Sequence, residues 1–238
     1  MTNARWIAII SLLAAAAVLS SGCAEKPKVY GRESTLALGG PPRVWAVAPV
    51  INLSGQSGVD ALLQADILYQ QLQTVEGVTV VPVDRVAQVY AAAGIEQVQS
   101  VEQANLVMDQ LGCDGLIVAS VTQFDPYNPP KFGGAIQLFE KPRGFQHPIA
   151  DPHDLLRAGS SSAAGEALPG HPDFEQVVGM FDAANGSVRD GVIAYAAGRH
   201  EPSGPMGVNE YFSNMDRYCG FAYYSLLDSL LVQLKNGR

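Results

Sequence analysis

The side chains with the greatest capacity for chemistry gather in one stretch of the sequence, at about residues 141–174. This stretch contains three histidines and three aspartates: His147, His153, His171, Asp151, Asp154 and Asp173. Imidazoles and carboxylates can ligate zinc or exchange protons with a substrate. The stretch has neither a His-Glu-x-x-His pattern nor paired cysteines, and its Pro, Gly, Ser and Ala residues predict no element that would fix a ligand. We therefore expect a polar loop without a metal or a cofactor. A hydrolase that uses Asp151, His153 and His171 is the alternative.

A second candidate is the polar turn at residues 52–58, Asn-Leu-Ser-Gly-Gln-Ser-Gly, which lies between an apolar run and a helical pattern. Phosphate loops and nucleophile elbows occupy such positions in enzymes. A phosphate loop requires a lysine, but residues 44–130 contain none, and an elbow requires glycine two residues after Ser57, where Val59 stands. His200 has no serine or cysteine partner visible in the sequence. We therefore expect a plain turn, and we predict that the protein is not an enzyme.

The amino terminus predicts export. Residues 1–22 contain a single charge, Arg5, followed by the apolar run Trp6–Leu19, which is too short to cross a bilayer as a mature helix. The small residues before Cys23 resemble the lipobox of bacterial lipoproteins, although Ser20 stands where leucine is usual. The resemblance implies that residues 1–22 are a lipoprotein signal peptide and that Cys23 carries a lipid, palmitate included, as a membrane anchor. An ordinary secretory signal cut nearby is the alternative. Ala24, by resemblance to enterobacterial sorting, implies a periplasm-facing protein in the outer membrane.

Charge and cysteine content narrow the partners further. The chain has 15 Lys and Arg against 23 Asp and Glu, a formal net charge of −8, so nucleic acid is a poor partner for it. Besides Cys23, two cysteines remain. Cys113 enters an apolar run and Cys219 lies within an apolar helical stripe, which favours two buried thiols over the one disulfide that an oxidising compartment would permit.

Hydrophobic periodicity predicts alternating strands and helices after a flexible tether at residues 23–42. The expected strands are residues 44–50, 78–83, 116–121, 135–140 and 177–183, and the expected helices are residues 61–76, 84–93, 101–111, 187–197 and 209–234. Capping boxes are expected at Ser100 with Gln103 and at Ser187 with Asp190, and Asp84 is expected to cap its helix. These elements predict one α/β domain at residues 43–238 with a loop excursion at about 141–174. Its expected fold is a three-layer sandwich, with a mixed, mostly parallel sheet of about five strands, helices on the faces and a long C-terminal helix.

The last of these helices is rich in aromatic residues. By the helical period, Phe221 and Tyr224 project roughly opposite to the face that covers the sheet. We therefore predict a surface for a partner or for self-association at Tyr218, Phe221 and Tyr224, and we add Tyr127 from the turn at residues 125–130. The alternative is that the preceding helix or the tether packs on these rings.

Three segments resemble a group of bacterial envelope lipoproteins: Val44–Gly55, Val78–Arg85 and Leu111–Ser120. They look like the curli-secretion-channel lipoprotein family, the penicillin-binding-protein activator lipoproteins and the amino-terminal domain of the Tol-system propeller protein. The resemblance covers roughly residues 43–140. It implies a small α/β sandwich that binds other envelope proteins and has no catalytic residues. A pore subunit is disfavoured, because no pair of alternating segments of about ten residues is present. We therefore predict a lipid-anchored, non-catalytic envelope module that binds another protein in assembly or activation.

Overall fold

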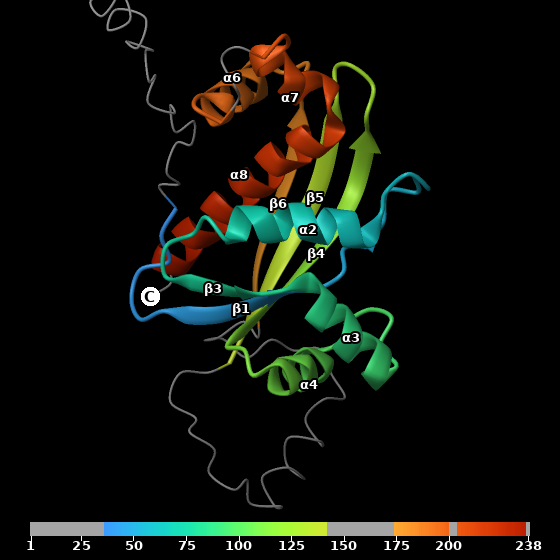
Figure 1. Ribbon diagram of the computed structural model, residues 1–238, viewed down its shortest axis with the longest axis vertical. Helices are drawn as coiled ribbons and strands as arrows, with labels where there is room; N and C mark the ends of the chain where they lie inside the picture. The colour runs from blue at the N-terminus through green and yellow to red at the C-terminus, as the bar shows by residue number, and fades with distance from the viewer. Residues whose placement is uncertain (1–35, 142–173, 200–203, 237–238) are drawn as a thin grey trace, which may run out of the picture. The chain divides into compact units, whose positions relative to one another are not determined.

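Figure 1 shows the computed structural model, which describes residues 36–141, 174–199 and 204–236. Its strands are β1 (Arg43–Val47), β2 (Ile51–Asn52), β3 (Val78–Val81), β4 (Gly115–Asp125), β5 (Lys131–Glu140) and β6 (Glu175–Asp182). Its helices are α2 (Ala61–Leu72), α3 (Val83–Ala93), α4 (Val101–Leu111), α6 (Gly186–Ala196), η1 (Gly207–Asn209), α7 (Glu210–Ser213) and α8 (Met215–Asn236). None of the helices within these ranges is both long and apolar enough to cross a membrane.

The strands form one mixed sheet in the order β3-β1-β4-β5-β6, with β2 pairing beside β4. The pairs β1–β3, β1–β4 and β2–β4 are parallel, whereas β4–β5 and β5–β6 are antiparallel. The parallel strands are linked through helices, and the turn after β4 produces the antiparallel half. The predicted mixed α/β sheet is confirmed.

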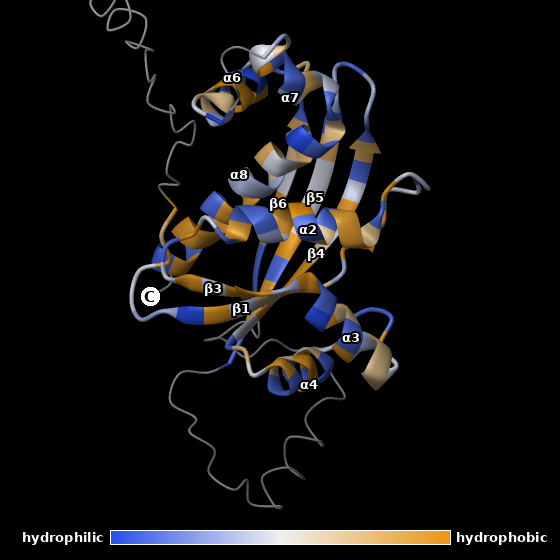
Figure 2. Cartoon of the chain, in the orientation of Figure 1, coloured by the Kyte–Doolittle hydropathy of each residue, from blue (hydrophilic) through white to orange (hydrophobic). Residues whose placement is uncertain are grey.

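Helices cover both faces of the sheet, and alternate residues along β1 and the residue after it enter the two cores on these faces. Trp45 and Val47 belong to the core beneath α2 and α8, whereas Ala46 and Ala48 belong to the core beneath α3 and α4. In Figure 1, α2 and α8 cross in front of the strands, and Figure 2 shows hydrophobic colour along β1 and in the middle of the sheet. The predicted three layers are therefore confirmed.

The N-terminal caps of the helices agree with the sequence-based predictions only in part. Ser100 Oγ accepts a hydrogen bond from the backbone N–H of Gln103, as predicted for α4. The prediction for α6 is wrong, because Asn185 lies ahead of Ser187 and its Oδ1 accepts from the Ser187 N–H. Asp84 does not cap α3, because this helix already begins at Val83 and Asp84 lies in its first turn.

The predicted helix at residues 209–234 is interrupted. Asn214 has an extended backbone between α7 and α8. Its Oδ1 accepts from the backbone N–H groups of Asp216 and Arg217, at 2.9 and 3.3 Å. An asparagine that satisfies the first free N–H groups of a helix is an N-cap, so α8 begins just after it. Apolar residues keep their helical spacing on both sides of Asn214. The spacing therefore predicted a single helix.

The packed chain begins before residue 43. Leu36 and Leu38 are buried in the core beneath α2 and α8. The Leu38 N–H donates to the Glu76 carbonyl at 3.0 Å, and the Glu76 N–H donates to the Leu36 carbonyl at 2.9 Å. The predicted boundary at residues 42 and 43 is therefore wrong: the end of the predicted tether packs on the domain, because its two leucines have an apolar core to enter. Residues 23–35 lie outside the described chain.

Candidate functional site

Most of the chemically capable residues predicted from the sequence lie outside the described residues. These are Cys23, His147, Asp151, His153, Asp154, His171, Asp173 and His200. Within residues 36–141, 174–199 and 204–236, no group of three or more His, Cys, Asp or Glu side chains could hold a metal ion. The hydrolase alternative therefore stays a sequence-based prediction.

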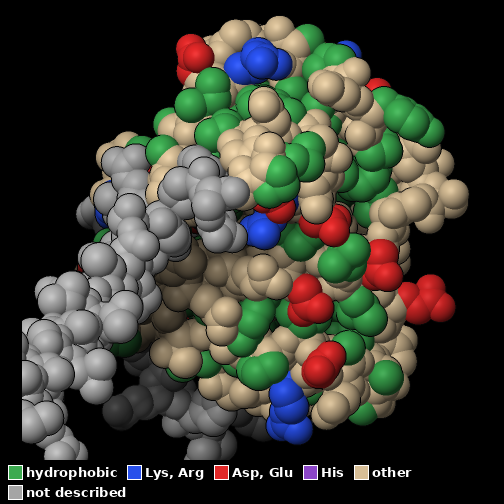
Figure 3. Space-filling model, turned by 45° about the horizontal axis from the view of Figure 1, so that its top comes forward, with side chains coloured by type: hydrophobic (Ala, Val, Ile, Leu, Met, Phe, Trp, Pro, Cys, Tyr) green, Lys and Arg blue, Asp and Glu red, His purple; other side chains and the backbone are tan. Residues whose placement is uncertain are grey.

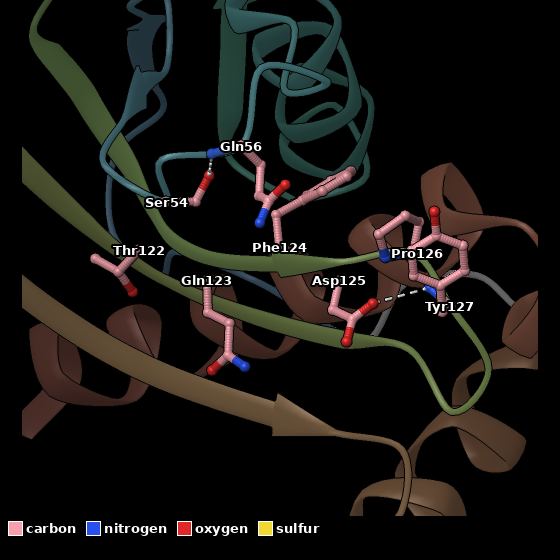
Figure 4. Close-up of a pocket in the computed structure, with 8 residues that line it drawn as sticks. All are labelled: Ser54, Gln56, Thr122, Gln123, Phe124, Asp125, Pro126 and Tyr127. Atoms are coloured by element: carbon pink, nitrogen blue, oxygen red, sulfur yellow. Dashed lines mark hydrogen bonds between the residues drawn. The ribbon is translucent and has the colours of Figure 1, made fainter.

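The structure has a hollow where the β2–α2 loop meets the outer end of β4. Its volume is about 390 Å³, and it is lined by Ser54, Gln56, Thr122, Gln123, Phe124, Asp125, Pro126 and Tyr127. Figure 4 shows Gln56 beside Phe124, with Tyr127 at the far end of the strand. The hollow thus brings together two segments that lie some seventy residues apart in the sequence, and one of them holds the predicted residue Tyr127.

Side-chain hydrogen bonds fix the loop that forms one wall of the hollow. Asn52 Oδ1 accepts from the Ser54 N–H at 3.0 Å and from the Ser54 hydroxyl at 2.7 Å. Asn52 Nδ2 donates to the Gln56 carbonyl at 2.8 Å, while Gly55 has a φ of 72°, which favours glycine. The Leu53 N–H donates to the Val121 carbonyl at 2.8 Å and so holds the loop against β4. Asn52, Ser54 and Gly55 are thus turn-forming residues, as the sequence predicted for this segment.

The other wall is shaped by an irregularity in β4. The β4–β5 register shifts between Val121 and Gln123, so Thr122 is the extra residue of a bulge. Beyond it, Asp125 Oδ1 accepts from the Tyr127 N–H at 3.1 Å and organises the turn into β5. Bulges redirect side chains at the end of a strand, and here Thr122 becomes exposed on the wall.

The chemistry of the lining suits binding rather than bond cleavage. Asp125 is the single carboxylate among the lining residues, and its Oδ1 is held by the turn. The Ser54 hydroxyl is engaged within its own loop, donating to Asn52 and accepting from the Gln56 N–H at 3.2 Å. A nucleophile requires an adjacent base, and the described lining residues provide none beside Ser54. Amides, hydroxyls and two aromatic rings remain, which are groups that hydrogen-bond and pack against a partner.

Exposed apolar side chains accompany the hollow. Tyr127 is 80% exposed and Leu53 is 62% exposed, and Leu62 and Leu63 are exposed at the start of α2. In Figure 3, which brings the top of Figure 1 forward, hydrophobic side chains spread over this end of the molecule among isolated charges. Sequence reasoning selected Tyr127 but missed Leu53. The available signal was a large apolar residue between Asn52 and Ser54 in an otherwise polar turn.

The predicted aromatic surface on α8 is wrong for two of its three residues. Tyr218 is fully buried and Phe221 is 5% exposed. The Phe221 ring packs against Tyr195 of α6 at 5.9 Å between centroids and against Phe181 of β6 at 5.6 Å. Tyr224 is half-buried and lies 5.1 Å from the Tyr195 ring. The alternative, in which the preceding helix packs on these rings, is what the structure shows.

The two described cysteines are buried and unpaired, as the sequence favoured. Burial raises the pKa of the Cys113 thiol to about 11 and that of Cys219 to about 12. Both thiols therefore stay protonated at neutral pH, and protonated thiols are poor nucleophiles.

Comparisons with known proteins find similar solved structures but no similar sequence. No protein-family model and no curated protein sequence matches it. Among solved structures, the LpoB C-terminal domain from Salmonella enterica is 16% identical, with a TM-score of 0.35, and the match covers 42% of this chain and 73% of that one. Lipoprotein GNA1162 from Neisseria meningitidis is 13% identical, with a TM-score of 0.34, covering 52% of this chain and all of the other. PelC from Paraburkholderia phytofirmans, described as a dodecamer, is 11% identical, with a TM-score of 0.35, covering 86% and 95%.

The likeness to the LpoB domain and to lipoprotein GNA1162 is one of fold alone.

Proposed function

We propose that this protein is a lipid-anchored, non-catalytic envelope lipoprotein that binds another protein through the hollow between the β2–α2 loop and the β4–β5 turn. The observation that carries the proposal is the exposure of Tyr127 and Leu53 on the two segments that line the hollow. Aromatic and aliphatic side chains of this kind anchor protein interfaces, because they bury a large apolar area when a partner covers them.

Hydrogen bonds within each wall support the proposal. Both segments are held by their own side chains, through Asn52 in the loop and Asp125 in the turn. A surface that is already ordered loses little conformational entropy on binding, so more of the contact energy remains as affinity. The lining also supplies amides and hydroxyls, which can form the polar rim of such an interface.

Photo-crosslinking in intact envelopes tests the surface. A photoreactive amino acid replaces Tyr127 in one variant and Val232 in a matched control, because Val232 is an exposed apolar residue on α8. We expect a discrete crosslinked protein with the probe at position 127 and none with it at position 232. Tyr127→Ala together with Leu53→Ser should then weaken binding of that protein at least roughly tenfold, as is typical for loss of interface anchors. Equal crosslinking at both positions contradicts the proposal.

The anchor has its own test. Cys23→Ser removes the only thiol that the lipobox resemblance makes available for lipid attachment, so the variant should move from the membrane to the periplasmic fraction. Fractionation after a carbonate wash measures the change, with Cys113→Ser as the control that keeps the membrane location. Retention of the Cys23→Ser variant in the washed membrane shows that the anchor is elsewhere.

A further inference from the structure

The strand β6 forms one edge of the sheet, and within the described residues it lacks several of the features that protect such edges. β5 pairs with it on one side, and no described strand pairs with it on the other. Protected edges are very short or carry lysine, proline or a bulge. The opposite edge, β3, has four residues, whereas β6 has eight, without lysine or proline and without a register shift against β5. Within the described chain, β6 therefore offers a row of free backbone N–H and carbonyl groups.

Apolar side chains border this edge on both faces of the sheet. Val177 and Phe181 point into the core beneath α8 and remain partly exposed. Val178 and Met180 point to the opposite face, where they are 67% and 59% exposed. The core beneath α3 and α4 reaches this half of the sheet only at Phe139 and Phe174, so the described helices leave Val178 and Met180 uncovered.

We propose that β6 pairs in antiparallel fashion with β6 of a second copy of this chain, about a two-fold axis through Gly179. Directly opposite residues in an antiparallel pair lie on the same face, so a two-fold register must be centred on one residue. With Gly179 at the centre, Val178 faces Met180 of the second copy and Val177 faces Phe181 of the second copy. The pairing extends the sheet across both molecules and joins their apolar rows on each face.

Charge and hydrogen bonding select this register over its neighbours. A centre at Val178 places the Glu175 carboxylate opposite Phe181, and a centre at Met180 places the Asp182 carboxylate opposite Val178. A centre at Gly179 places the amide of Gln176 opposite Asp182, to which an amide can donate. Both carboxylates are already held within one chain, since Gln233 Nε2 donates to Glu175 at 2.6 Å and Lys131 Nζ lies 3.0 Å from Asp182. The strand is thus complementary to itself, which identifies a second copy as the occupant.

Cysteine crosslinking tests the register in the full chain. Val178→Cys and Met180→Cys variants with different tags are produced together and oxidised mildly, and the matched control combines two tagged Val178→Cys variants. We expect the mixed pair to form a disulfide-linked dimer at least several times faster than the control, because residues 178 and 180 face each other whereas two residues 178 are diagonal. Crosslinking that is equal or faster in the control overturns the register.

A charge substitution tests the association itself. Val178→Lys places a lysine on the exposed edge and leaves the fold intact, because the replaced side chain is largely in solvent. Sedimentation of the purified full chain in detergent should show a two-copy species, and Val178→Lys should raise its dissociation constant at least tenfold while Val232→Lys does not. The proposal is overturned if only a single-copy species is present at every concentration. It is also overturned if both variants lose the two-copy species. Tyr127→Ala should leave this dimer unchanged, because Tyr127 does not lie on β6. A failure of the dimer proposal can therefore be distinguished from a failure of the proposed function.

Discussion

A buried amide joins the two helices that cover one face of the sheet. Gln64 of α2 is buried, and its Oε1 accepts a hydrogen bond of 3.1 Å from the hydroxyl of Tyr223 on α8. Further along the same helix, Gln71 Oε1 accepts a bond of 2.8 Å from the hydroxyl of Tyr195 on α6. Burial raises the pKa of Tyr195 to about 12, so this hydroxyl keeps its proton at neutral pH. Because buried polar atoms require partners, these two bonds fix how α2 sits against α6 and α8.

Cys219 lies in this same interface and makes stability depend on pH. Burial raises its pKa to about 12, whereas the thiol in the unfolded chain ionises at its ordinary value of 9.0. Above pH 9 the unfolded chain releases a proton that the folded chain keeps, so this stabilisation is complete below pH 9 and is lost progressively up to pH 12. Between pH 8 and 10 the loss should be about 1 kcal/mol.

Urea denaturation at pH 8 and pH 10 measures this difference, with Cys219→Ala as the comparison. The wild-type protein should lose about 1 kcal/mol more of its free energy of unfolding than the variant does. Cys113 is present in both proteins, so its own ionisation cancels. Equal losses in the two proteins contradict the assignment of this pH dependence to Cys219.

Single residues were predictable where their role is local. The turn chemistry of Asn52 and Gly55 is carried by neighbours within four residues, and such patterns are visible in a sequence. The role of Phe221 was not visible, because the helical period assigns the faces of α8 but cannot show that α6 returns to cover the second face. Leu53 was missed for a similar reason, since its place beside β4 is set by the bond from its N–H to the carbonyl of Val121, a residue far along the chain.

At the scale of elements, the pairing of β1 with β4 depends on Gly115, which lies opposite Trp45. A Cβ atom at this position of β4 would lie 2.6 Å from Trp45 Cδ1 of β1 and 3.2 Å from Leu138 Cδ1 of β5. Trp45 is fully buried, so its ring has no free space into which to move. Glycine is therefore required for β1 and β4 to pair at this point.

Gly115→Ala should lower the free energy of unfolding by about 1–3 kcal/mol, as overpacking of a dense core does. Chemical denaturation of the variant and of Gly58→Ala measures the effect. Gly58 is a suitable control, because a Cβ atom added there would meet no other atom within 4 Å and the residue is exposed. A change at Gly115 no larger than that at Gly58 refutes the requirement for glycine.

The elements themselves were predictable more reliably than their ends. Apolar runs located the buried portions of β4 and β5, at residues 116–121 and 135–140. The strands continue to Asp125 and begin at Lys131, through polar and exposed residues such as Thr122. These outer portions form strands because they pair with each other, from Gln123 opposite Gly133 to Asp125 opposite Lys131, and not because of a hydrophobic pattern. The hollow beside Tyr127 depends on this extension.

For the whole molecule, the segment between β5 and β6 should be dispensable for folding. The two strands pair continuously from Lys131 opposite Asp182 to Leu138 opposite Glu175, so a short connection would serve them. The composition of the segment predicts too little apolar burial to offset the entropy of ordering some thirty residues. Replacement of residues 144–170 by a short Gly/Ser linker should therefore change the melting temperature by less than about 3 °C. A fall of roughly 10 °C in thermal denaturation would show that the segment packs on the core.

The three-layer organisation was predictable because alternating strands and helices permit few arrangements. The start of the domain was not, because Leu36 and Leu38 lie in a stretch with no sustained period and pack only where Glu76 and the core are close in space. Two isolated apolar residues in a sequence cannot be told from part of a flexible tether unless the core that they enter is known.

The early start of the domain determines where tension enters the fold. The segment at residues 36–38 is attached by two backbone hydrogen bonds to Glu76, whereas β1 just beyond it is paired on both sides, with β3 and β4. A force that pulls on the chain ahead of Leu36 therefore acts first on those two hydrogen bonds and on the packing of Leu36 and Leu38. It acts on β1 only after these contacts have broken. When these contacts break, each released residue lengthens the chain ahead of the domain by about 3.3–3.6 Å. The segment at residues 36–38 can therefore detach and lengthen the chain ahead of the domain while the strands of the sheet stay paired.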